Sequence, residues 1–147
     1  MGELAFRTSD ASGIGAHNVS FVKAVNEVAS STTPSGALSF GVSTANTNAS
    51  EAMRLDSSGN LLVGKTVTDF GVAGVNLEND GSLAAIRSGA APANFNRLAS
   101  DGDIARFFKD GTEVGSIGAY LGSPYIGTGD TGLVFETTNN RIEPFDT

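Results

Sequence analysis

The stretch GNLLVGKT, residues 59–66, carries the residue types of a phosphate-binding loop at the required spacing. Gly59, Gly64, Lys65 and Thr66 match the pattern G-x-x-x-x-G-K-S/T, in which backbone N–H groups and a lysine hold phosphates and a hydroxyl holds Mg²⁺. Such a loop joins a buried strand to a helix whose N-terminus adds positive potential. Whether the chemistry is available therefore depends on the elements around the motif.

Those surroundings favour a β-hairpin. Residues 61–63 are three consecutive apolar residues that suit a strand better than a solvated loop. The segment before them ends in turn residues, and no helical apolar face follows Thr66. We expect a strand at 52–55, a turn at 56–60 and a second strand at 61–64. Nucleotide binding is not expected.

A second formal match lies in GTGDTG, where Gly127, Gly129 and Gly132 have the spacing of a dinucleotide-binding fingerprint. That site needs a preceding strand and a following helix. The following LVFETT is typical of a strand, so we interpret the motif as a glycine-rich turn. Its small residues would suit a place where chains approach closely. No cofactor is expected.

Other candidate chemistry is sparse. His17 is the only histidine and there is no cysteine, so a catalytic triad or zinc site within one chain is not expected. Three copies of His17 on a trimer axis could bind a metal, but a solvated or hydrogen-bonded loop residue is the favoured interpretation. Carboxylates gather in turn segments, where they typically cap the backbone; these are Glu78, Asp80, Asp101, Asp103 and Asp110. We expect no catalytic and no metal residues.

Receptor contact is the remaining site function. The chain has no tryptophan and two tyrosines, Tyr120 and Tyr125, beside Pro124. Aromatic rings commonly form the platform of a glycan site, so these two residues are the candidates for a surface contact. The alternative, that they pack between strands, is favoured over it.

Charge and composition exclude several classes of partner. The net charge is −7, from 9 basic and 16 acidic residues, with no basic run, so nucleic-acid binding is not expected. No stretch of about 18 apolar residues is present to span a membrane. Met1-Gly2-Glu3 has no basic or apolar region, so no signal peptide is expected there, and without cysteine no stability from disulfides is expected.

Turn signals recur about every ten residues and separate short, roughly alternating segments, which is typical of all-β proteins. Segment 17–30 fits either a helix or a buried strand, and we favour the strand. Large apolar residues are spread thinly along the 147 residues, with Gly alone contributing 19. Such a chain is more easily stabilised by burying surface against copies of itself.

A weak repeat, Leu-x-x-x-Gly-x-Leu/Ile, occurs three times, in segments 55–64, 77–89 and 98–111. Each unit predicts one hairpin, and repeated hairpins that cannot bury a face alone imply stacking. We expect Gly59, Gly81, Gly102 and Gly111 in hairpin turns, several with positive φ.

The segment EAMRLDSSGNLLVGKT (51–66) resembles a motif that recurs in tailed-phage fibre proteins. Segments 96–118 and 125–146 are similar to the region that precedes the self-cleaving intramolecular chaperone of such fibres, so that the resemblance spans residues 51–146, about two-thirds of the chain. It implies an elongated, intertwined, β-rich homotrimer that projects from the virion toward the host surface. The implied chaperone would follow Thr147, and its catalytic residues are not in this sequence, so no self-cleavage is carried over.

Residues and resemblance together predict a non-enzymatic, structural tail-fibre component of the virion that contributes to host-cell attachment. We expect an N-terminal β region at 1–66 and a C-terminal hairpin region at 67–147, which could be one continuous trimeric unit. The expected partners are two further copies of the chain, other tail or fibre proteins and a host receptor. Two alternatives stay open, namely a stalk or module of a polysaccharide-degrading tailspike and a capsid decoration protein.

Overall fold

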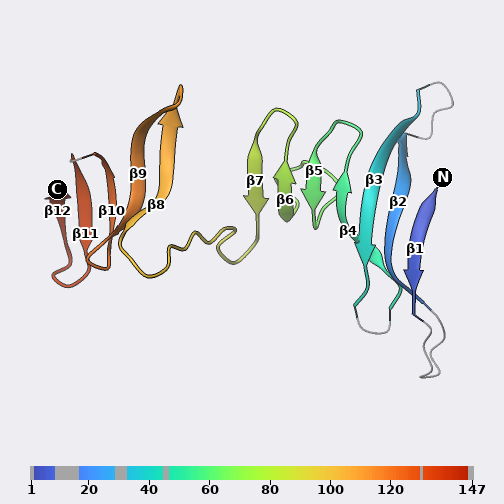
Figure 1. Ribbon diagram of the computed structural model, residues 1–147, viewed down its shortest axis with the longest axis horizontal. Coiled ribbons are helices and arrows are strands. Elements are labelled where there is room, and N and C mark those ends of the chain that lie inside the picture. Colours follow the sequence, from blue (N-terminus) through green and yellow to red (C-terminus); the bar gives the residue numbers. More distant parts are fainter. Residues whose placement is uncertain (1, 9–16, 29–32, 45–46, 130, 146–147) are drawn as a thin grey trace. The chain divides into compact units, whose positions relative to one another are not determined.

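The computed structural model describes residues 2–8, 17–28, 33–44, 47–129 and 131–145. Within these ranges the chain is all-β: twelve strands form two antiparallel sheets and no helix occurs (Figure 1). The expected fold class is confirmed at this level.

The chain divides into two compact units, residues 1–92 and residues 93–147. The first holds a seven-stranded sheet in chain order, with strands β1 (Glu3–Arg7), β2 (Asn18–Val28), β3 (Ser35–Val42), β4 (Ser50–Leu55), β5 (Leu61–Val63), β6 (Gly74–Leu77) and β7 (Leu83–Ile86). The second holds a five-stranded sheet, with strands β8 (Gly102–Lys109), β9 (Thr112–Tyr120), β10 (Ser123–Thr128), β11 (Thr131–Glu136) and β12 (Arg141–Phe145). The division expected after residue 66 falls inside the first sheet, between β5 and β6.

Every strand pairs with its neighbour in the sequence, so each sheet is a meander built from successive hairpins. The ambiguous segment from residue 17 onward is the long strand β2, as favoured from its four valines; residues 29 and 30 lie outside the described residues. The P-loop match is a hairpin, because β4 pairs antiparallel with β5 across residues 56–60.

Two of the repeated segments form the same five-residue turn. In the first, the N–H of Asp56 donates to the carbonyl of Asn60, and the N–H of Gly59 donates back to Asp56. In the second, Glu78 and Ser82 take the places of Asp56 and Asn60, and Gly81 takes that of Gly59. Gly59 and Gly81 have φ angles of 86° and 91°, a conformation that glycine adopts at no steric cost.

The third segment departs from the repeat. Gly111 lies in the β8–β9 turn with φ of 78°, directly after Asp110 with φ of 52°, as an Asp-Gly hairpin turn requires. Gly102, however, begins β8 with φ of 133°, so its expected place in a hairpin turn is wrong. The Arg97 guanidinium fills the space beside it, where an added Cβ would lie 3.0 Å from Arg97 Cζ.

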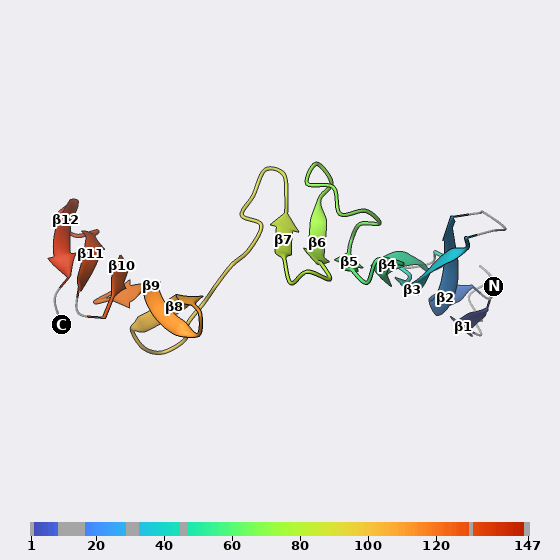
Figure 2. The same ribbon diagram turned by 90° about the horizontal axis from the view of Figure 1, so that it is seen from above.

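Over the two units together, most of the buried side chains are polar. Seen from above in Figure 2, neither sheet has a helix or a second sheet of its own unit laid over it. Among the described residues the buried hydrophobic side chains are Ala37, Leu62, Tyr125 and Val134, and the buried polar ones are Ser39, Asn60, Lys65, Asn76, Ser116 and Ser123. Polar residues therefore hold more of the buried positions than apolar ones.

Candidate functional site

One face of the first sheet carries a row of five leucines. Directly opposed pairs run from β3 to β7, and the row consists of Leu38, Leu55, Leu61, Leu77 and Leu83. Opposed residues in an antiparallel sheet lie on the same face with their Cβ atoms about 5 Å apart, so the five side chains form one continuous ridge. Leu83 is 65% exposed, and Leu38, Leu55 and Leu77 are exposed with it, whereas Leu61 is half-buried.

A second apolar row lies two residues along each strand on the same face, because side chains alternate between faces. It consists of Phe40, Met53, Val63, Val75 and Ala85. Toward the N-terminus the face continues through Leu4 and Val22, which oppose each other on β1 and β2. We call the residues of these two rows, with Leu4 and Val22, the apolar face of the first sheet.

The opposite face of the same sheet is polar and better covered. Its central row consists of Lys23, Ser39, Arg54, Leu62, Asn76 and Ala84. Leu62 and Asn76 are 0% exposed. The sheet therefore covers the face that carries amides, hydroxyls and charges and leaves most of the leucines exposed. An antiparallel sheet usually does the opposite, with its apolar face on the core and its polar face in solvent.

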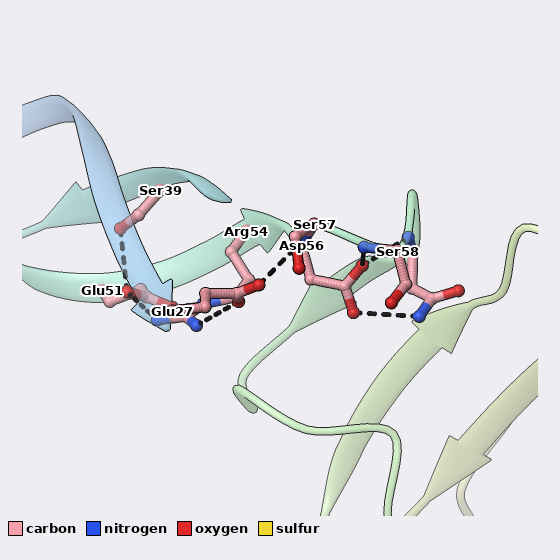
Figure 3. A network of polar contacts seen from close by, with 8 residues as sticks. Glu27, Ser39, Glu51, Arg54, Asp56, Ser57 and Ser58 are labelled. Carbon is pink, nitrogen blue, oxygen red and sulfur yellow. Dashed lines mark hydrogen bonds and ion pairs between the residues drawn. The ribbon is translucent and has the colours of Figure 1, made fainter. Parts of the chain in front are cut away.

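On this covered face, Arg54 is the centre of a network of hydrogen bonds and ion pairs (Figure 3). Its guanidinium contacts Glu27 at 2.9 Å and Glu51 at 2.5 Å and 2.9 Å, from strands β2 and β4. Ser39 donates its hydroxyl to Glu51 at 2.9 Å, and the N–H of Ser57 donates to Glu27 at 3.0 Å. One cation thus bridges two carboxylates, each of which also accepts a neutral donor.

The electrostatics follow from these contacts. Hydrogen bonds from Ser57, then from Arg54, lower the pKa of Glu27, and hydrogen bonds from Arg54, then Ser39, lower the pKa of Glu51. The bonds to Glu51 and Glu27 raise the pKa of Arg54. Burial opposes ionisation of Asp56, but hydrogen bonds from Asn60, Ser58 and Gly59 outweigh it and lower its pKa. At neutral pH these four groups are charged and each is hydrogen-bonded within the protein, which fits a structural role.

Lys65, the lysine of the P-loop match, is committed to the protein interior. It is 6% exposed, and its Nζ donates to the Asp69 carbonyl at 2.8 Å and to Asn76 Oδ1 at 3.3 Å. Gly74 makes room for it, since an added Cβ there would lie 2.9 Å from the lysine stem. A strand precedes Gly64 but no helix follows Thr66 among the described residues. The elements that a phosphate site requires are therefore not in place.

The second sheet repeats the division into two faces. One row of directly opposed residues is apolar and consists of Ala105, Ile117, Ile126, Leu133 and Pro144. Phe107, Phe135 and Ile142 lie on the same face by strand alternation and are exposed with it. We call these eight residues the apolar face of the second sheet.

The other face of the second sheet is centred on Tyr125, which is 8% exposed. Its ring lies over Gly118, where an added Cβ would come within 2.7 Å of the ring. Its hydroxyl donates to Asp103; this hydrogen bond, followed by one from Ser116, lowers the pKa of Asp103, and the bond to Asp103 raises that of Tyr125. Tyr125 thus occupies the packed position that was weighed against receptor contact. Tyr120, by contrast, is 43% exposed.

The GTGDTG motif forms the β10–β11 hairpin. Gly127 opposes Gly132 across the two strands, and a Cβ on Gly132 would lie 2.8 Å from the Gly127 Cα. Gly129 has φ of 55°, and strand β11 stands where a dinucleotide site would need a helix. Asp130 lies outside the described residues. The glycines serve close backbone approach within the sheet.

The remaining candidates are dispersed. The carbonyl of His17 accepts the N–H of Thr8 at 3.2 Å, beside the start of β2. Asp101 accepts the Leu121 N–H at 2.6 Å, Asp110 pairs with Lys109 at 2.5 Å, and Asp80 accepts the Ser82 N–H at 2.8 Å. Across the part of the chain that the structure describes, no three His, Asp or Glu residues come together as metal ligands.

Sequence reasoning missed the Arg54 cluster and the bond between Lys65 and Asn76. Both depend on strand register, which residue types alone do not fix. A signal for the leucine row was present, since LDSSGNL and LENDGSL each place two leucines around a five-residue turn. Such a turn returns the chain so that the flanking leucines oppose each other, as Leu55 and Leu61 do.

Among the described residues no helix is long and apolar enough to cross a membrane. Comparisons of the chain with protein-family models, with curated proteins and with solved structures found no match.

Proposed function

We propose that the chain is a structural, non-enzymatic component of a phage tail fibre, assembled as an elongated homotrimer on the virion and contributing to host-cell attachment. The apolar faces of the two sheets are the surfaces that assembly buries. Each chain turns its apolar faces toward the other two copies, and its polar, covered faces outward.

The observation that carries the proposal is the exposed leucine row on β3–β7. Fully burying a leucine side chain contributes about 1.5–3 kcal/mol, and monomeric proteins rarely expose large contiguous apolar patches. The described residues include few buried hydrophobic side chains to stabilise a chain of 147 residues. Association covers the leucine row and supplies the missing core in one step.

The occupant of these faces is best taken as a second and third copy of the same chain. Both sheets present the same kind of face, and the ridges contain only apolar side chains, so identical surfaces meet without burying charge. The number three follows from the resemblance of segments 51–66, 96–118 and 125–146 to fibre proteins. Threefold association around an axis also lets neighbouring chains cover exposed sheet edges such as that of β1.

Light scattering on the purified chain tests the assembly directly. The expected mass is three times the 14.9 kDa of one chain, and the melting temperature should rise with protein concentration because unfolding is coupled to dissociation. Negative-stain electron microscopy should show rods. A mass of one chain with a concentration-independent melt, or a mass of two chains, would contradict the proposal.

A further inference from the structure

A pocket of about 290 Å³ opens on the second sheet, where the ends of β9–β12 meet. The residues that line it include Tyr120, Leu121, Ser123, Glu136, Glu143 and Pro144. Its volume is at the lower limit of small-molecule sites, which suits a ligand of one or two rings.

Most of the pocket lining lies on the face of the second sheet opposite to its apolar face, whereas Pro144, on the edge strand β12, belongs to the apolar face itself. Glu143 opposes Val134, which opposes Tyr125, in the covered row. Ser123 and Tyr120 oppose each other two residues further along, on the same face by alternation. Packing through Ile117, Ile126 and Leu133 would therefore leave the pocket residues of that face open to solvent.

At the pocket, the backbone of Leu121 has a conformation that non-glycine residues rarely adopt. Leu121 has φ of 50°, which costs a non-glycine residue about 1 kcal/mol or more, and its side chain is 80% exposed. Asp101 fixes this conformation by accepting the Leu121 N–H at 2.6 Å. Leu121 and Gly122, with φ of 50° and 76°, form the two-residue turn between β9 and β10, and this turn leaves the Leu121 side chain exposed at the pocket.

The two carboxylates are available as acceptors but not as unpaired charges. Arg141 contacts Glu136 at 3.1 Å and Glu143 at 2.7 Å, and Asn139 donates to Glu136 at 2.9 Å. Each carboxylate has about four lone-pair sites, so both keep capacity for further donors. A cationic ligand would compete with Arg141 and an anionic ligand would meet two carboxylates, whereas neutral hydroxyl donors face neither obstacle.

We propose that this pocket binds a neutral saccharide unit, with the C–H face of the sugar against Tyr120 and Leu121 and its hydroxyls donating to Glu136 and Glu143. An exposed aromatic ring offers an apolar surface with a polar tip, which matches the two-sided character of a sugar. The inference rests on the proposed function in that the saccharide would belong to the host surface. The pocket itself is formed within one chain.

Saturation-transfer NMR with the full chain tests the proposal. The probes are glucose, galactose and N-acetylglucosamine, with glucuronate and tetramethylammonium as charged comparators. At least one neutral sugar should bind and the charged probes should not. Tyr120→Ala and Glu143→Gln should each weaken that binding ~10-fold, the loss expected when one good contact is removed. Tyr120→Phe should retain it, because the ring is kept.

Glu113→Gln is the matched control, since Glu113 is an exposed carboxylate of β9 paired with Arg106 outside the pocket, and it should leave binding unchanged. Scattering and melting checks on each variant separate a lost contact from a lost fold. Absence of binding by every neutral sugar, binding of the charged probes alone, or binding unaffected by both pocket variants would overturn the proposal. A monomer that still binds sugar would contradict the proposed trimer and support the saccharide site. A trimer that binds no sugar would support the assembly and contradict the saccharide site.

Discussion

The side-chain oxygen of Asn60 accepts the backbone N–H of Asn79 at 2.9 Å, and the Asn79 amide donates to the carbonyl of Ser58 at 2.6 Å. These bonds join the turn between β4 and β5 to the turn between β6 and β7, which have the same internal hydrogen bonds. The repeat in the sequence is thus a repeat in space. Asn60, which is buried, thus joins the two hairpins from the face opposite to the leucine row.

The first prediction concerns this link between the hairpins. Asn60→Ala leaves the Asn79 N–H without its acceptor and removes the Asn60 amide from Asp56, so it should lower the free energy of unfolding by about 2–3 kcal/mol. Asn79→Ala keeps the backbone bond to Asn60 and loses one side-chain bond, for a loss of about 1 kcal/mol. Urea denaturation at fixed protein concentration measures both. Equal or reversed losses would contradict the link.

Much of the fold follows from the sequence because hairpin meanders are local. Turn residues at 56–60 and 110–111 fix where the strands reverse, so strand boundaries and the β4–β5 pairing could be predicted. Gly102 could not be placed, because a Ser-Asp-Gly signal describes a bend before a strand as well as a turn between strands. Its conformation depends on Arg97, which fills the adjacent space through a tertiary contact.

The candidate surfaces were only partly predictable. Alternation showed that strands have one apolar side, yet it could not show that this side faces solvent in both units. In the first unit the opposite face is covered because Arg54, Lys65 and their partners satisfy one another there. Tyr120 and Tyr125 looked equivalent in sequence, and only the register of β9 and β10 separates the ring over Gly118 from the exposed one.

The second prediction tests the leucine row. In an isolated chain, Leu83→Asp replaces a 65% exposed side chain and should change stability little. In an assembly that buries the row, it places a charge in an apolar interface and should dissociate the complex or lower its melting temperature by several degrees. Light scattering and thermal melts at two concentrations measure this.

Leu98→Asp is the control for that prediction, because Leu98 is also exposed but lies in the segment before β8 and on no strand. It should leave the mass and the melting temperature close to those of the parent chain. Identical, negligible effects of both variants would show that the leucine row is not an interface.

The third prediction concerns backbone conformation alone. An added Cβ at Gly81 meets no atom within 4 Å, so Gly81→Ala pays only for φ of 91° and should destabilise by about 1 kcal/mol. Gly36→Ala in β3, where φ is not in the left-handed region and the nearest atom is at 3.6 Å, should be neutral or stabilising. Chemical denaturation distinguishes them. A neutral Gly81→Ala would contradict the required turn conformation.

The fourth prediction concerns the Arg54 cluster. Arg54→Met leaves Glu27 and Glu51 without their shared cation in a largely covered site. The expected loss is about 2–3 kcal/mol, below the range for fully buried pairs because water still reaches the carboxylates. Lys109→Met breaks the exposed pair with Asp110 and should change little. Denaturant midpoints compare the two, and equal effects would show that Arg54 is no more than a surface charge.

The fifth prediction is a dependence of stability on acid. Hydrogen bonds and ion pairing lower the pKa of Glu27 and Glu51 in the folded chain, so between the folded and unfolded values the unfolded state binds more protons. Stability from these groups is fully present above the unfolded pKa of about 4.3 and is lost as pH falls through the lower, folded values. The melting temperature should therefore hold from neutral pH to about 5 and fall steeply below about 4.

Glu51→Gln separates this effect from the general acid response. This variant lacks the Glu51 carboxyl and therefore the stability that is lost when that group is protonated. Its melting temperature should be lower than that of the parent chain at neutral pH and should decline less steeply below about pH 4. Glu113→Gln removes the same charge from an exposed pair and should run parallel to the parent. Protein concentration and ionic strength are held constant, because association and screening shift the melt independently. If the melting temperatures of Glu51→Gln and Glu113→Gln declined equally as the pH falls, protonation of the Arg54 cluster would not contribute to the acid dependence of stability.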